Sequence, residues 1–227
     1  MHEGHRKRIR EKYRRNGLEN FADHEVLELL LFYANKRSDT NETAHKLIQR
    51  FGSLSAVFEA SYDELIQVED IGDIAATLIT MVPALFRRYS NDKLNDISEI
   101  NNTQQAIEYV KPKFFGLNSE RCALVILDSQ NRVKNFIFVC EGSLNATSLD
   151  MRKCAQLALS NNAAAVIMVH NHPSGVASPS RADIETTQAF VSAMAPIGIT
   201  VSDHIILSDD DSFSMASHER SAYIFSK

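Results

Sequence analysis

An apolar run that ends in two histidines constrains this chain more than any other stretch. Residues 163–169 are apolar without interruption, which is typical of a buried strand, and His170 and His172 follow directly. Side chains at positions i and i+2 of a strand point to the same face. Both imidazoles can therefore be directed at one point, just before a turn that is rich in proline and glycine.

A polar residue and an acid follow this turn, at the start of a predicted helix that runs to about residue 195. They are Ser180 and Asp183, and their spacing is also that of a helix N-cap whose third residue reaches back. Two imidazoles and one carboxylate with an open fourth position form the ligand pattern of a catalytic zinc site. The two interpretations are compatible, because a cap can fix the rotamer of a ligand.

These residues resemble the signature of a known superfamily. His-x-His, ten residues and then Asp, with Ser three before the Asp, resembles the JAMM motif of JAB/MPN-domain metalloproteases. The string His-Asn-His-Pro-Ser-Gly at 170–175, with Ser-Pro-Ser at 178–180 and Asp203-His204-Ile-Ile, resembles the bacterial RadC branch. The resemblance implies a Zn²⁺-dependent hydrolase of peptide or isopeptide bonds, with His170, His172 and Asp183 as metal ligands.

The resemblance also implies catalytic roles. Ser180 matches the family's serine that supports the oxyanion of the tetrahedral intermediate. Glu120, directly before the apolar run 122–127, matches the glutamate that acts as general base. Glu141, at the end of the next predicted strand, is the competing candidate, and sequence order favours Glu120.

Two features near this signature bear on substrate and site. RadC relatives usually carry His-Pro-Arg-Glu before the central strand, where this chain has Asp-Met-Arg-Lys at 150–153, so its substrate can differ from theirs.

His204 is predicted to be a strand residue that hydrogen-bonds to Asp203 or to the backbone. The alternative is that His204 supports the metal ligands from behind.

The pattern of elements predicts an α+β protein with an all-helical unit (1–90), a linker (91–102) and a JAB/MPN-like mixed sheet flanked by helices (103–227). Predicted helices cover 22–33, 40–51, 54–58, 62–68, 74–89, 103–110 (capped by Thr103), 150–160 and 180–195. Predicted strands cover 122–127, 133–140, 163–170, 199–207 and 223–225.

The helical unit carries two features associated with nucleic acid. Residues 68–76 resemble a helix-hairpin-helix element, but Asp70 replaces its first glycine, and Glu69 and Asp73 would repel phosphate. The first fifteen residues form a basic arm. This arm predicts weak DNA contact through four cations, Arg6, Lys7, Arg8 and Arg10.

Composition narrows the class of protein. The net charge of −5 gives no general attraction to nucleic acid. Three widely spaced cysteines favour reduced core thiols in a cytoplasmic protein. The early apolar stretch 26–34 is short and interrupted by Glu28, so no membrane span is expected.

Other functional classes stay open at this point. A DNA-associated binding protein whose JAB domain is mainly a scaffold is the main alternative to a hydrolase. Two histidines and one carboxylate also suit non-heme iron, although the order of ligands here is the reverse of the usual one. An amidohydrolase barrel needs about 250 residues, more than the chain provides after its helical unit. The sequence leaves the substrate and the oligomeric state open.

Overall fold

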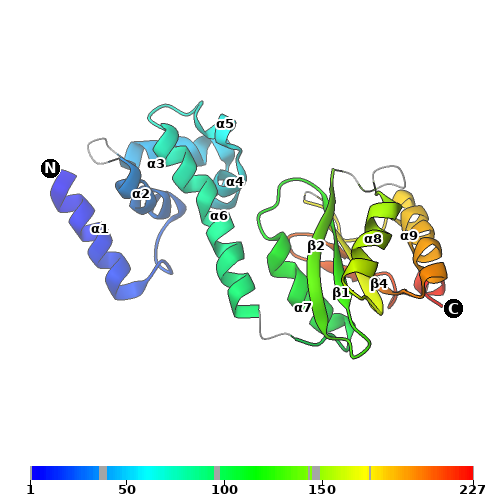
Figure 1. Ribbon diagram of the computed structural model, residues 1–227. Helices are drawn as coiled ribbons and strands as arrows, with labels where there is room; N and C mark the ends of the chain where they lie inside the picture. The colour runs from blue at the N-terminus through cyan, green and yellow to red at the C-terminus, as the bar shows by residue number, and fades with distance from the viewer. Residues whose placement is uncertain are drawn as a thin grey trace. The chain divides into compact units, whose positions relative to one another are not determined.

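The computed structural model describes residues 2–35, 40–94, 98–142, 144, 149–173 and 175–226 (Figure 1). Contacts divide the chain into a helical unit, residues 1–86, and a sheet domain, residues 87–227. The predicted α+β class is confirmed: a helical N-terminal region precedes a mixed five-stranded sheet with helices.

The helical unit is organised around one apolar cluster. Leu27, Leu47, Val57, Leu65 and Ile79 are all fully buried in it. Its helices are α1 (His2–Asn16), α2 (Asp23–Ala34), α3 (Thr40–Phe51), α4 (Leu54–Glu59), α5 (Tyr62–Leu65) and the first part of α6 (Asp73–Leu94).

Side-chain caps determine where the short helices of this unit begin. Ser53 accepts the backbone N–H of Ala56 at the start of α4, and Ser61 forms a capping box with Glu64 at the start of α5. Such caps satisfy backbone donors that a helix start leaves without partners. Gly52, with φ of 93°, ends α3 at the predicted residue.

The turn between α5 and α6 contains Asp70 at the position where a hairpin glycine was expected. Asp70 has φ of 67°, the left-handed conformation that glycine adopts most readily. Its carboxylate and that of Glu69 both contact the Lys46 ammonium, at 3.3 and 2.6 Å. Two of the three acids around the predicted phosphate site are therefore paired within the protein.

The sheet has the strand order β2-β1-β3-β4-β5. Only the β3–β4 pair is parallel, because helix α9 connects those two strands; the other pairs are antiparallel. The strands are β1 (Arg121–Leu127), β2 (Val133–Glu141), β3 (Ala165–Asn171), β4 (Thr200–Leu207) and β5 (Ser212–Ser214).

Helices cover both faces of this sheet (Figure 1). On one face Leu124 and Met168 pack against α8 (Met151–Ser160) and α9 (Arg181–Met194). On the other face Val125 and Val169 pack against α7 (Thr103–Phe114). Burial on both faces explains why β1 and β3 are continuous apolar runs rather than alternating ones.

Several predicted boundaries differ from the structure. The cap of α7 is Asn102, whose side-chain oxygen accepts the Gln105 N–H at 2.9 Å, and Thr103 is the first helical residue. The predicted strand 223–225 was wrong: residues 222–224 form a 3-10 helix. The last strand is instead β5, a short Ser-Phe-Ser segment whose composition gives no strand signal.

The segment predicted as a linker, 91–102, is only partly described. Helix α6 continues to Leu94, five residues past its predicted end. Residues 95–97 lie outside the described part of the chain. From residue 98 the backbone pairs with the sheet domain, since Ile100 N–H donates to Asn131 and the Ser98 carbonyl accepts from Val133. Among the described residues, no helix combines the length and apolar character needed to cross a membrane.

The left-handed conformation at position 70 leads to a stability prediction. Asp70→Gly and Asp70→Val both remove the exposed contact with Lys46, so they differ mainly in backbone strain. We expect Asp70→Gly to stay within about 1 kcal/mol of the parent and Asp70→Val to lose about 2 kcal/mol, because a β-branched residue is strained at positive φ. Urea unfolding measures both. Equal stability of the two variants would contradict the assigned conformation.

Candidate metal centre

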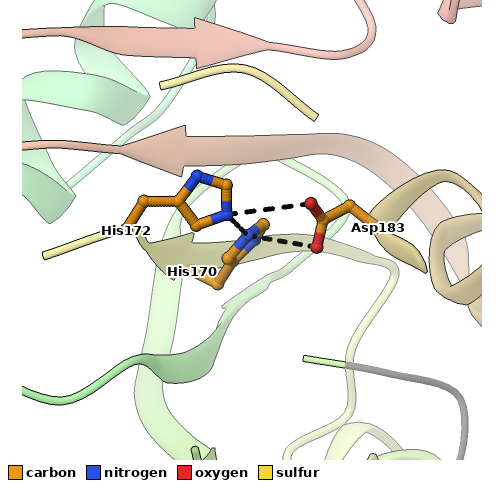
Figure 2. Close-up of side chains that lie close together, drawn as sticks. All are labelled: His170, His172 and Asp183. Atoms are coloured by element: carbon orange, nitrogen blue, oxygen red, sulfur yellow. Dashed lines mark hydrogen bonds and ion pairs between the residues drawn. The ribbon is translucent and has the colours of Figure 1, made fainter. Parts of the chain in front are cut away.

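Three predicted ligands converge at the end of β3, facing the N-terminus of α9 (Figure 2). His170 is the penultimate residue of β3, His172 follows the strand, and Asp183 lies in the first turn of α9. Each ring directs its Nε2 atom at the Asp183 carboxylate, with His170 at 3.2 Å and His172 at 3.7 Å. The two Nε2 atoms lie 2.8 Å apart.

These separations fit a tetrahedral metal ion. Ligand atoms about 2.0–2.1 Å from a tetrahedral zinc lie about 3.3 Å from one another. The two Nε2 atoms lie 2.8 Å apart, and His170 Nε2 lies 3.2 Å from Asp183 Oδ1, both near this value. His172 Nε2 lies 3.7 Å from the other carboxylate oxygen, Oδ2. The group His170, His172 and Asp183 could therefore hold a metal ion, as the sequence pattern predicted.

Asp183 divides its two carboxylate oxygens between the helix and the histidines. Its Oδ2 atom accepts the backbone N–H of Ser180 at 2.7 Å, while the Ser180 hydroxyl accepts the Asp183 N–H at 3.2 Å. This is the predicted capping box. The cap holds the carboxylate so that Oδ1 faces His170. A negative group is also favoured at the positive end of the helix dipole.

His172 is held by two backbone groups. The backbone N–H of His172 donates to the Leu207 carbonyl of β4 at 2.7 Å, which extends the pairing of β3 with β4 past the end of β3. Its Nδ1 atom lies 3.0 Å from the Val176 carbonyl. A carbonyl can only accept, so Nδ1 carries the proton and Nε2 keeps its lone pair for a metal.

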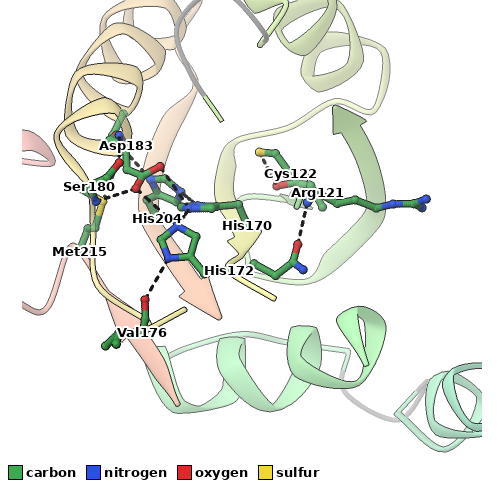
Figure 3. A network of polar contacts seen from close by, with 12 residues as sticks. Arg121, Cys122, His170, His172, Val176, Ser180, Asp183, His204 and Met215 are labelled. Carbon is green, nitrogen blue, oxygen red and sulfur yellow. Dashed lines mark hydrogen bonds and ion pairs between the residues drawn. The ribbon is translucent and has the colours of Figure 1, made fainter. Parts of the chain in front are cut away.

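His204 is a strand residue whose backbone N–H bonds to Asp203, as predicted, and its ring lies directly behind His170, as in the alternative. The His204 Nε2 atom is 2.7 Å from His170 Nδ1 (Figure 3). The His204 Nδ1 atom is 2.6 Å from the Thr187 hydroxyl. Strand register explains the position of the ring, because β4 presents His204 to the same face of the sheet as His170.

Burial keeps both of these rings neutral. Burial lowers the pKa of His170 to about 4, with Asp183 opposing the shift and His172 adding to it. Burial, with the nearby histidines, also holds the pKa of His204 well below its usual value. A neutral imidazole is the form that binds a metal.

Glu120, the predicted general base, lies immediately before β1 and is half-buried. The antiparallel pairing of β1 with β3 begins at Cys122, opposite His170, two residues after Glu120. The Asn171 side chain fixes this alignment by accepting the Arg121 N–H at 2.7 Å and donating to the Ser119 carbonyl at 3.2 Å. Glu120 is not one of the three clustered ligand residues, as suits a base.

Glu141, the competing candidate, belongs to the other face of the sheet. It pairs with Arg121, whose neighbour Cys122 shares a face with His170. Side chains alternate along a strand, so Glu141 points away from the histidines. Its carboxylate accepts from the Ser119 hydroxyl at 3.0 Å and from the Arg121 guanidinium at 2.9 Å.

The remaining residues that the sequence singled out have local roles. Asp150 caps α8 by accepting the Lys153 N–H at 3.0 Å, and Lys153 is exposed. Ser174 of the His-Asn-His-Pro-Ser-Gly string lies outside the described residues. All three cysteines are free thiols.

Sequence reasoning missed Asn171 and Thr187. Thr187 had a detectable signal, because it lies four residues after Asp183 and therefore on the same face of α9. Asn171 had none, because its role depends on which strand pairs with β3.

Comparison with known proteins agrees with this fold. The sheet, its flanking helices and the His-His-Asp group define a JAB domain, and the RadC-like JAB domain matches residues 100–220. The UPF0758 N-terminal region matches residues 3–77. The chain belongs to this RadC-like UPF0758 family.

Three relatives, each named a UPF0758 protein, match over nearly the whole chain. One from Fusobacterium nucleatum is 34% identical over 93% of this chain and 94% of its own length. One from Alteromonas mediterranea is 35% identical over 92% and 93%. One from Acinetobacter baylyi is 34% identical over 92% of this chain and 78% of its own.

The low pKa of His170 predicts how the metal-free protein responds to acid. Unfolding restores an ordinary pKa near 6.5, so the unfolded chain binds a proton that the folded protein takes up only near pH 4. Stability should therefore fall as the pH drops from about 6.5 to about 4. Urea unfolding with a chelator, at several pH values in this range, measures the slope. We expect His170→Gln to reduce the slope and leave the part that buried His204 contributes, and an unchanged slope would contradict the assignment.

Proposed function

We propose that this protein is a zinc-dependent metallohydrolase that cleaves a peptide or isopeptide bond. The observation that carries the proposal is the convergence of His170, His172 and Asp183, whose ligand atoms all lie within 4.8 Å of one another. The choice of an amide bond rests on the resemblance to JAB-domain metalloproteases. The donor set of two nitrogens and one oxygen suits Zn²⁺.

The ligands and two further residues would divide the work. Bound Zn²⁺ would supply Lewis acidity and lower the pKa of a coordinated water. His170, His172 and Asp183 would hold the ion. Glu120 would take a proton from the attacking water and transfer it to the leaving amine.

Ser180 is suited to the oxyanion role because its cap contact leaves its proton unused. The Ser180 hydroxyl accepts the Asp183 N–H, so its own O–H remains available as a donor. Ser180 is exposed, so a substrate carbonyl can reach it. Ser180 can thus cap helix α9, which carries Asp183, and also stabilise negative charge on the substrate.

The first test is the metal content of the purified protein after zinc is supplied. We expect about one zinc per chain, lost in His172→Ala and retained in both Glu120→Gln and Glu141→Gln. His172→Ala removes a ligand, whereas the two glutamate variants leave all three ligands in place. Absence of zinc from the parent protein would overturn the hydrolase proposal.

The second test separates the two glutamates by activity on peptide and isopeptide substrates. Loss of a general base lowers the rate by about 10²–10⁴-fold. We expect this loss in Glu120→Gln, while Glu141→Gln, on the opposite face of the sheet, keeps the parent rate. The reverse pattern would transfer the role of base to Glu141.

A DNA-associated role is the second candidate, favoured by the outer face of α1. Lys7, Arg8, Arg14 and Arg15 are exposed on the side of this helix that faces away from buried Ile9. Among the described residues the three arginines have no carboxylate partner. The guanidinium of Arg6, which was also predicted to contact DNA, donates to the Asn35 carbonyl and lies over the Phe32 ring.

Salt dependence tests this candidate. Each phosphate contact contributes about 0.9 to the slope of log affinity against log salt. If α1 binds duplex DNA, the double variant Arg8→Gln with Arg15→Gln should lower the slope by about 2. The control removes the same charge elsewhere, at exposed Lys134 and Arg220. Binding that is equally salt-dependent in both double variants would exclude α1 as the contact.

A further inference from the structure

A buried chain of hydrogen bonds runs behind the metal centre, from one ligand to another (Figure 3). His170 Nδ1 lies 2.7 Å from His204 Nε2, and His204 Nδ1 lies 2.6 Å from the Thr187 hydroxyl. The Thr187 hydroxyl in turn lies 2.6 Å from the backbone carbonyl of Asp183. His204 and Thr187 are both fully buried, so no bulk water competes for these contacts.

The last acceptor in this chain sets the direction of every proton in it. A backbone carbonyl only accepts, so the Thr187 hydroxyl must donate its single proton to Asp183. The hydroxyl oxygen is then an acceptor for His204, whose Nδ1 must carry a proton. The neutral His204 ring keeps a lone pair on Nε2 and accepts a proton from His170 Nδ1.

We propose that His204 and Thr187 are positioning residues that hold His170 in the tautomer whose Nε2 lone pair is free for the metal. The inference rests on the metal centre proposed above. Neither residue touches the metal or the substrate. Both act through the ring of His170 and through the backbone of Asp183, and they thereby link two ligands that come from different elements.

His172 needs no such support. We call the hydrogen-bonded chain from His170 through His204 and Thr187 to Asp183 the relay, and the contrast with His172 shows its role. The Nδ1 atom of His172 hydrogen-bonds directly to the backbone carbonyl of Val176. The Nδ1 atom of His170 points into the interior, toward β4, where His204 is its hydrogen-bond partner. With the opposite tautomer of His170, two lone pairs would face each other at 2.7 Å in the buried interior, and the ligand atom Nε2 would carry the proton. With the assigned tautomer, the lone pairs that face each other are those of the two ligand atoms Nε2, 2.8 Å apart, where a metal ion can bind both.

Tautomer states in the zinc-free protein test the relay without any activity assay. Long-range ¹H–¹⁵N NMR spectra distinguish a protonated Nδ1 from a protonated Nε2. We expect His170, His172 and His204 all to be protonated at Nδ1. Protonation of His170 at Nε2 in the parent protein would overturn the proposal.

Zinc affinity, measured by competition with a chromophoric chelator, gives the second readout. Loss of an outer contact to a metal-binding histidine typically costs about 10–100-fold in affinity. We expect this loss in Thr187→Val, which removes the acceptor for His204, and near-parent affinity in Thr187→Ser, which keeps the hydroxyl. His204→Gln, whose side-chain oxygen can replace the Nε2 acceptor, should bind zinc more tightly than His204→Leu.

A neighbouring threonine provides the matched control. Thr186 is fully buried, and its hydroxyl has no hydrogen-bond partner among the residues that the structure describes. Thr186→Val makes the same chemical change one residue away, and we expect it to leave both the zinc affinity and the His170 tautomer at parent values.

The outcomes separate the two proposals. A parent protein that binds no zinc would contradict the metal centre, while the NMR spectra would still test the relay. A parent that binds zinc, together with a Thr187→Val variant of equal affinity and unchanged His170 tautomer, would contradict the relay alone.

Discussion

The contact between the first turn of α9 and the end of β3 is the constraint on which the metal centre depends. Asp183 takes part in both elements, because one carboxylate oxygen caps the helix and the other faces the histidines. A shift of the helix along its axis would carry Asp183 away from the histidines and remove the third ligand. Pro173, Gly175 and Pro179 lie in the short connection between β3 and α9, and the helix begins directly after them.

Each ligand is held by protein contacts that do not involve a metal. His172 bonds to a carbonyl, Asp183 bonds to a backbone N–H, and His170 is held through His204. The geometry is therefore arranged before a metal arrives. A nearly buried carboxylate beside two imidazoles, one of them kept neutral by burial, lacks a full positive partner. A divalent cation supplies that charge, and this electrostatic need favours metal binding at this point.

The parts of the site that follow local rules could be predicted from the sequence. The two-residue period of a strand places His170 and His172 on one face, and the three-residue spacing of a cap places Ser180 against Asp183. The fold class followed from the change of hydrophobic period near residue 120. Resemblance to a family supplied the role of Glu120, which stays a prediction.

The parts that depend on long-range pairing could not be predicted. The direction of the His204 ring follows from the register of β4 against β3, which no local pattern encodes. Asn171 fixes the backbone around Glu120 only because β1 pairs with β3. Strand β5 and the final 3-10 helix were missed because polar Ser-Phe-Ser and the apolar residues 223–225 each suggest the opposite structure.

Zinc K-edge X-ray absorption of the zinc-loaded protein tests the central claim most directly, because it reports the atoms around the metal. We expect a shell of nitrogen and oxygen at about 2.0–2.1 Å, with the outer scattering of two imidazoles and no sulfur. A shell at about 2.3 Å would show thiolate ligands and would contradict the site, since it would place the metal on the cysteines instead.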